Sequence, residues 1–109
     1  MSKPVDIQDA NFNEMVLKSK TPVLVDFWAP RCAPCRLVEP VVDQLAAEYE
    51  GKVSFFRLNR DENMRVATRF NVMSIPTVII FKDGKPYSSH TGFTRDTKKQ
   101  LIDNLNSVL

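Results

Sequence analysis

The fold depends on the stretch Trp28-Ala29-Pro30-Arg31-Cys32-Ala33-Pro34-Cys35-Arg36, which holds both cysteines and the only tryptophan of the chain. The run 22–27 before it is apolar apart from Asp26, a pattern typical of a buried strand. After it, apolar residues recur with the spacing of one helix face, at Leu37, Val38, Val41, Val42, Leu45, Ala46 and Tyr49. The two cysteines are therefore predicted to lie where a strand turns into a helix.

A cysteine at the start of a helix is chemically activated. Unpaired N–H groups and the positive end of the helix dipole stabilise negative charge there, and the thiolate is the form that attacks disulfides. We expect Cys32 to be the attacking thiol, and Cys35, one turn later and more buried, to be the resolving thiol. The alternative is half of a zinc site, but zinc needs four ligands, and the sequence offers no other Cys and a single His, His90.

Composition narrows the class of protein. The chain has 109 residues, enough for one domain spanning 1–109, and its 43% hydrophobic and 26% charged residues are ordinary for a soluble globular protein. A net charge of +2 is too small to indicate nucleic acid as a partner, and no apolar run approaches the ~20 residues of a membrane helix. Residues 1–6 contain no signal-peptide core, so we expect a cytoplasmic location, where a cysteine pair is more often catalytic or metal-binding than structural.

The remaining pattern predicts an α/β fold. Strands are expected at 5–7, 23–27, 53–58, 78–81 and 87–91, and Asp83-Gly84 predicts a hairpin between the last two. Helices are expected after an Asp9 cap, over about 34–50 with Pro40 inside, after Asn59 or Asp61, and after Thr94. Their inward positions are predicted to be Phe12, Met15, Val16, Met64, Ala67, Phe70, Leu101, Ile102, Leu105 and Val108. This order indicates a central mixed five-stranded sheet flanked by four helices.

Several motifs together resemble the thioredoxin family over essentially the whole chain. A lone Cys-x-x-Cys is a weak signal, but here it follows Asp-Phe-Trp-Ala and precedes Ile-Pro-Thr by about forty residues. The motifs that carry the resemblance are Asp26-Phe27-Trp28-Ala29, Cys32-Ala33-Pro34-Cys35, Pro40, Ile75-Pro76-Thr77, Phe81-Lys82-Asp83-Gly84-Lys85 and Gly92. The resemblance implies the thioredoxin fold, with Pro76 as a cis proline that faces the dithiol.

Asp26 interrupts an apolar strand, where an acid is costly to bury. The resemblance implies that it accepts a proton from Cys35 through water, with a raised pKa. The alternative is an acid at an exposed strand end, paired with Arg57. Arg57 itself is either a residue that tunes Asp26 or a surface side chain.

The resemblance also implies a docking surface for target peptides. Trp28 is expected both to be buried and to shield the dithiol, while Ala33 and Pro34 support the motif between the cysteines. Pro76 would keep backbone groups of Ser74 and Ile75 free to pair with an extended target, and Gly92 would allow close approach. His90 is expected to be either structural or solvated.

This sequence differs from the commonest family pattern at a few positions. Arg31 stands where Trp is usual, Ala33 and Ser74 where Gly is usual, and Arg57 where Lys is usual. None of these changes removes a group that disulfide exchange needs. The Arg31 guanidinium is expected to favour the Cys32 thiolate and to make the docking surface more cationic.

The function implied is that of a small protein-disulfide reductase, monomeric and without a bound cofactor or metal. Its partners would be a thioredoxin reductase and disulfide-containing target proteins. Oxidases and isomerases of the same chemistry commonly carry His where this chain has Pro34. A different class of function, a scaffold or binding subunit that uses the fold and not its thiols, stays open from the sequence.

Overall fold

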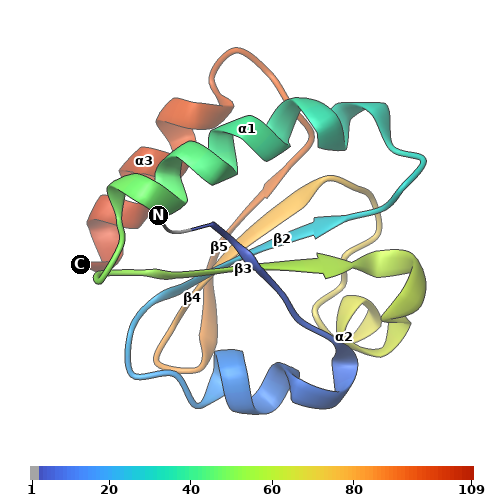
Figure 1. The fold of residues 1–109 in the computed structure, drawn as a ribbon, viewed down its shortest axis with the longest axis horizontal. Helices are drawn as coiled ribbons and strands as arrows, with labels where there is room; N and C mark the ends of the chain where they lie inside the picture. The colour runs from blue at the N-terminus through green and yellow to red at the C-terminus, as the bar shows by residue number, and fades with distance from the viewer. Residues whose placement is uncertain (1–2) are drawn as a thin grey trace.

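The computed structural model describes residues 3–109, so the first two residues of the amino-terminal stretch 1–6 lie outside it. A five-stranded sheet with the order β1-β3-β2-β4-β5 forms the centre (Figure 1). The strands β1, β3 and β2 are parallel, whereas β4 runs antiparallel to β2, and β5 runs antiparallel to β4. Their bounds are Val5–Asp6 for β1, Val23–Trp28 for β2, Ser54–Asn59 for β3, Thr77–Lys82 for β4 and Lys85–Thr91 for β5.

Helices cover both faces of this sheet. Figure 1 shows α1 (Ala33–Glu48) and α3 (Thr97–Val108) on one face, and the 3-10 turn η1 (Asp9–Asn11), the π-helix η2 (Asn13–Leu17) and α2 (Met64–Arg69) on the other. A second 3-10 turn, η3 (Arg60–Glu62), connects β3 to α2. The predicted α/β class with a mixed sheet is confirmed. Within residues 3–109, no helix has the length and apolar character needed to cross a bilayer.

Alternation along β2 creates two cores. Val23, Val25 and Phe27 point to the face with α2, where Phe12, Phe70 and Phe81 form an aromatic cluster with ring centroids 5.2–5.7 Å apart. Leu24 points to the other face and joins a core with β3, β4, α1 and α3. That second core contains Phe55, Ile80, Val38, Val42, Leu45, Leu101, Leu105 and Val108.

The face covered by α1 changes character along β2. Leu24 is apolar, but the next residue on that face is Asp26, and the one after it is Trp28. Asp26 is in register with Arg57 on β3 and with Val78 on β4. Parallel alignment therefore places an acid beside a base, one row from the carboxyl end of β2, where α1 begins.

The first helical segment differs from its prediction. In place of an α-helix capped by Asp9, the chain forms a 3-10 turn with Gln8 at its N-cap, followed by the π-helix η2. Asp9 instead accepts hydrogen bonds from the backbone N–H groups of Arg65 and Val66 at the start of α2, at 3.2 and 3.0 Å. A distant contact therefore determines what this acid caps, and local spacing could not indicate it.

Four other local predictions also need correction. Leu37 and Met64 are 55% and 54% exposed because neighbouring residues, among them Val38 and Val66, take the inward positions of α1 and α2. Met15 is exposed because Phe12 and Val16 already take the inward positions of the irregular segment. Helix α3 begins at Thr97, and the Thr94 hydroxyl accepts from the N–H of Asp96 in the preceding turn.

The Asp83-Gly84 hairpin is confirmed. Both residues have positive φ angles, 54° and 77°, as a two-residue turn between twisted strands requires. A Cβ on Gly84 would lie 2.8 Å from the carbonyl oxygen of Leu17, so the turn packs directly against the end of η2. Glycine is needed here for both its conformation and its size.

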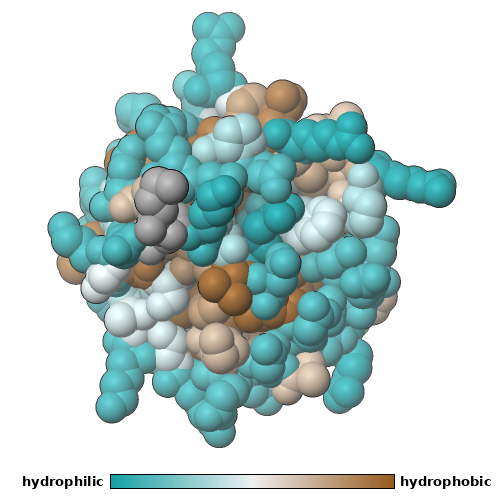
Figure 2. Space-filling model, in the orientation of Figure 1, coloured by the Kyte–Doolittle hydropathy of each residue, from teal (hydrophilic) through white to brown (hydrophobic). Residues whose placement is uncertain are grey.

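A hollow lies at the start of β3, at the end of the strand opposite Asn59. Figure 2 shows a mostly hydrophilic face with a hydrophobic patch near the middle, where β1 and β3 lie in Figure 1. The hollow, of about 290 Å³, lies along this sheet edge and is lined by residues that include Val5, Val53 and Phe55. No cysteine lines it, and its β3 residues are those at the start of the strand, so it lies away from the dithiol.

Candidate active site

Cys32 and Cys35 form a disulfide at the start of α1. Cys32 is the N-cap residue of this helix, and its Sγ accepts a hydrogen bond from the Cys35 N–H at 3.2 Å. The strand-to-helix junction predicted from the sequence is therefore present. The expected difference in burial is small, with exposed fractions of 7% for Cys32 and 5% for Cys35. The two sulfurs differ mainly because Cys32 lies outside the helix, at its positive end, whereas Cys35 lies within the first turn.

A second segment packs against the disulfide. Ile75 contacts the cluster formed by Ala29, Cys32 and Cys35, together with the partly buried Trp28. The Ile75-Pro76 peptide bond is cis, as the family resemblance implied. Ile75 therefore packs against the two cysteines although it lies about forty residues away in the sequence.

Gly92 joins the same site through the backbone. Its N–H donates to the carbonyl oxygen of Pro76 at 2.8 Å, and its φ of +83° is one that L side chains rarely adopt. The Ser74 carbonyl was expected to be free, but it accepts a hydrogen bond from the Thr77 hydroxyl at 2.6 Å. By contrast, no hydrogen bond within residues 3–109 uses the backbone N–H or C=O of Ile75.

Asp26 is buried beneath this site, with an exposed fraction of 1%, so the alternative of an exposed strand end is wrong. Neither carboxylate oxygen has a hydrogen-bond partner among residues 3–109. Burial is the largest influence and raises the Asp26 pKa to about 7, the Arg57 charge opposes that rise, and Glu39 and Asp43 add to it. The acid therefore exchanges its proton near neutral pH.

Arg57 makes three contacts around Asp26. Its Nε lies 3.9 Å from Asp26 Oδ2, its Nη1 lies 3.1 Å from Glu39 Oε2, and its guanidinium carbon lies 4.5 Å from the centroid of the Trp28 ring. Arg57 is thus not the solvated surface side chain that was one of its two interpretations. Sequence reasoning missed Glu39, although its position four residues after Cys35 places it on the same side of α1, one turn along.

A hollow of about 210 Å³ opens beside Cys35. It is lined by Trp28, Pro30, Cys35, Arg36, Glu39 and Arg57, so it extends from the second cysteine to the residues that surround Asp26. This volume is enough for several water molecules. Protons could therefore move between Cys35 and the neighbourhood of Asp26 without direct contact of the two side chains.

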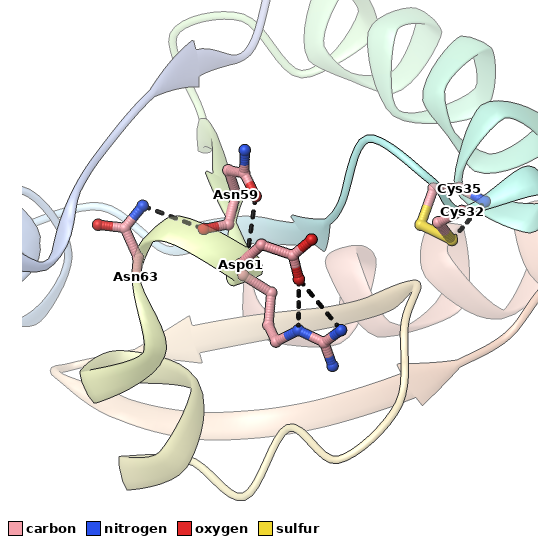
Figure 3. Close-up of polar contacts among 6 residues, drawn as sticks. Cys32, Cys35, Asn59, Asp61 and Asn63 are labelled. Atoms are coloured by element: carbon pink, nitrogen blue, oxygen red, sulfur yellow. Dashed lines mark hydrogen bonds and ion pairs between the residues drawn. A yellow bond between two sulfur atoms is a disulfide. The ribbon is translucent and has the colours of Figure 1, made fainter.

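The turn after β3 lies at the carboxyl ends of the parallel strands, as the disulfide does (Figure 3). The Asn59 side chain accepts from the Asp61 N–H at 3.0 Å, and Asn63 donates to the Asn59 carbonyl at 3.0 Å. Asn63 also donates to Gln8 and accepts from the Asp9 N–H, so the amino-terminal segment is tied to this turn.

The motif that carries the cysteines has exposed side chains, at Arg31, Ala33 and Pro34.

The chemistry of the site lies in its sulfurs. No group of three or more His, Cys, Asp or Glu side chains within the described part of the chain is placed to hold a metal ion. His90 has a structural role, one of the two expected, because its Nε2 lies 2.9 Å from the Thr97 hydroxyl. The redox centre is the pair Cys32–Cys35.

A disulfide at a helix N-terminus, faced by a cis-proline loop on a mixed sheet, defines the class of thioredoxin-fold dithiol proteins. The family model described as Thioredoxin matches residues 3–107. The chain belongs to the thioredoxin family. The Thioredoxin M-type, chloroplastic, of Spinacia oleracea is 46% identical over 104 residues, which cover 95% of this chain and 56% of the relative.

Two more relatives agree with this assignment. The Thioredoxin M-type, chloroplastic, of Pisum sativum is 49% identical over 86 residues, covering 79% of this chain and 50% of the relative. The Thioredoxin of Synechocystis sp. is 54% identical over 85 residues, covering 78% and 79%. The chain thus spans about half the length of the spinach and pea relatives and most of the Synechocystis one.

Proposed function

We propose that this protein is a thiol–disulfide oxidoreductase that reduces disulfide bonds in other proteins. The observation that carries the proposal is the Cys32–Cys35 disulfide, with Cys32 as the N-cap of α1. A sulfur at this position gains from the helix dipole and from the Cys35 N–H when it becomes a thiolate. The family relatives, which are named thioredoxins, support the same chemistry.

The first step uses the reduced protein. The Cys32 thiolate attacks one sulfur of the target disulfide, so that a bond forms between Cys32 and that sulfur while the target's own S–S bond breaks. The other target sulfur leaves as a thiolate. The protein and its target are then joined by a mixed disulfide.

The second step releases the target. The Cys35 thiol gives its proton, through water in the adjoining hollow, to the Asp26 carboxylate, and the resulting thiolate attacks the Cys32 sulfur. The remaining target sulfur departs as a thiolate, and Cys32 and Cys35 form the disulfide seen in the structure. The target gains two electrons and the protein loses two.

Targets would bind across the loop that faces the disulfide. We assign this role to Trp28, Arg31, Ser74, Ile75, Pro76 and Gly92, with Ala33 and Pro34 supporting the cysteines. The unpaired backbone of Ile75, packed against the disulfide cluster, offers a donor and an acceptor to an extended peptide. Because the Ser74 carbonyl is already engaged by Thr77, Ile75 is the main pairing position.

The oxidised form needs two electrons from outside to act again. A thioredoxin reductase is the partner we propose for this step, as the family implies, and disulfide-containing proteins are the targets. We propose that residues 1–109 act as one domain and as a monomer. We propose a cytoplasmic location, with a plastid as the alternative because the spinach and pea relatives are named chloroplastic.

The direct test is reduction of insulin disulfides driven by dithiothreitol. The wild-type protein should accelerate the reaction, and Cys32→Ser should abolish that acceleration. Cys35→Ser should instead accumulate mixed disulfides with the target through Cys32, whereas Cys32→Ser should trap little. Equal trapping by both variants would refute the assigned roles, and an inactive wild-type protein would favour the scaffold function.

A further inference from the structure

Arg57 and Asp26 face each other across neighbouring strands without closing into a hydrogen-bonded pair. The two residues are in register on β3 and β2, yet Arg57 Nε and Asp26 Oδ2 lie 3.9 Å apart, beyond hydrogen-bond distance. Arg57 Nε and both Asp26 oxygens are buried and have no hydrogen-bond partner among residues 3–109. Leaving such groups unsatisfied is costly, so other contacts must hold the guanidinium where it is.

Two contacts hold the far side of the guanidinium. Nη1 lies 3.1 Å from Glu39 Oε2, within ion-pair distance, and the guanidinium carbon lies 4.5 Å from the centroid of the Trp28 ring. Glu39 lies on α1, so it contacts the guanidinium from the helix, whereas Asp26 faces Arg57 from β2. Trp28 supports the flat guanidinium but carries no charge that could compete with Asp26.

We propose that Glu39 is a positioning residue that holds the Arg57 guanidinium beyond hydrogen-bond distance of Asp26 and so leaves the Asp26 carboxyl without a hydrogen bond beside the dithiol. The inference rests on the proposed role of Asp26 as proton acceptor for Cys35. A buried carboxyl without a hydrogen bond holds its proton to higher pH than one that is hydrogen-bonded to a guanidinium. Glu39 would thereby set the pH range in which Asp26 exchanges its proton.

The charged groups around Asp26 supply a matched control. Arg57 faces it from β3, Glu39 and Asp43 act on it from α1, and its neighbour on β4, Val78, is uncharged. Asp43 raises the Asp26 pKa through its charge, as Glu39 does, but within residues 3–109 it forms no ion pair with Arg57. Removal of Asp43 therefore changes the local charge and leaves the Arg57 position unchanged.

The test follows the Asp26 carboxyl carbon by NMR while the oxidised protein is titrated with acid. Glu39→Ala should lower the midpoint of this titration by about half to one pH unit, because Arg57 becomes free to pair with Asp26. In an Arg57→Gln background, the effect of Glu39→Ala should fall to half or less. The effect of Asp43→Ala should be the same in both backgrounds.

Three outcomes would overturn the proposal. They are a Glu39→Ala shift of equal size with and without Arg57, a shift no larger than that of Asp43→Ala, and a midpoint that rises. Glu39→Gln is a further variant, because its amide oxygen can accept a hydrogen bond from Arg57. The shift caused by Asp43→Asn measures the contribution of a lost charge and is subtracted from the Glu39→Gln shift. The remaining shift should be smaller than that of Glu39→Ala. The titration observes Asp26 directly, so it tests positioning even if Asp26→Asn leaves turnover unchanged, a result that would refute only the proposed proton transfer.

Discussion

The two faces of the sheet are built differently. The face under α1 and α3 is covered by long, regular helices of 16 and 12 residues, whereas the other face is covered by η1, η2 and the six-residue α2. The irregular face is apolar along the whole of β2, from Val23 to Phe27. The regular face is apolar only as far as Leu24, and then presents Asp26 and Trp28.

This difference separates stability from chemistry. On the irregular face, packing continues to the carboxyl ends of the strands, and nothing there needs to exchange a proton. On the α1 face, one row of the core is given to a buried acid, at a cost in free energy that packing elsewhere must offset. Substitutions on the two faces should therefore affect different properties.

The largest effect on stability is expected from Phe81→Ala on the irregular face. Phe81 is buried, and its ring contacts both Phe12 and Phe70 in the aromatic cluster. Its loss should lower the free energy of unfolding by about 3–5 kcal/mol, measured by denaturant titration. Insulin reduction per folded molecule should be unchanged, and a loss of that activity would contradict the separation of the two faces.

Asp26→Ala, on the α1 face, should change stability in the opposite direction and in a pH-dependent way. Folding raises the Asp26 pKa from its ordinary value of 3.8 to about 7, so the folded protein retains a proton that the unfolded chain releases between these values. Because of this difference, the free energy of unfolding of the wild type falls as pH rises from about 4 to about 7, and it falls no further at higher pH.

The Asp26→Ala variant lacks this fall in stability with rising pH, because it has no carboxyl at this position. Relative to the wild type it should gain roughly 2–4 kcal/mol between pH 4 and pH 8, while disulfide reduction slows. Denaturant titrations of both proteins at the two pH values measure the gain. A relative stability that stays constant, or that falls towards pH 8, would mean that Asp26 is stabilised as a carboxylate in the folded protein.

Asp9→Ala tests how the irregular face is held together. The Asp9 carboxylate accepts from two N–H groups at the start of α2, so its removal should lower the free energy of unfolding by about 1 kcal/mol. Glu14→Ala is the control, because Glu14 is an exposed acid of the same segment whose ion pair is with Lys18. Equal, negligible effects of the two substitutions would show that Asp9 does not stabilise α2.

The smallest effect is expected at the surface of the motif. Arg31 is exposed beside Cys32, so its charge should favour the Cys32 thiolate of the reduced protein and make the wild type a slightly weaker reductant than Arg31→Trp. The difference should be at most about 20 mV in equilibrium with glutathione, and high salt should reduce it. A wild type that is equally or more reducing at low salt would leave Arg31 as part of the docking surface only.

The regular face could be predicted because its signals are local. The period of α1 indicates its buried positions Val38, Val42 and Leu45. The irregular face could be predicted less well, because its helices are short and depend on distant partners. Asp9 illustrates the limit, since its hydrogen-bond partners lie more than fifty residues further along the chain.

Spacing and residue type were enough to predict the order of the strands and helices, the junction that carries Cys32 and Cys35, and the presence of an acid in the central strand. These signals act over a few residues, so they can be read along the chain. Two features became apparent only in three dimensions: the burial of Asp26 without a hydrogen-bond partner, and the sharing of Arg57 between Asp26, Glu39 and Trp28. The reason is physical: burial and charge pairing depend on how β2, β3 and α1 come together, and no local pattern contains that distance.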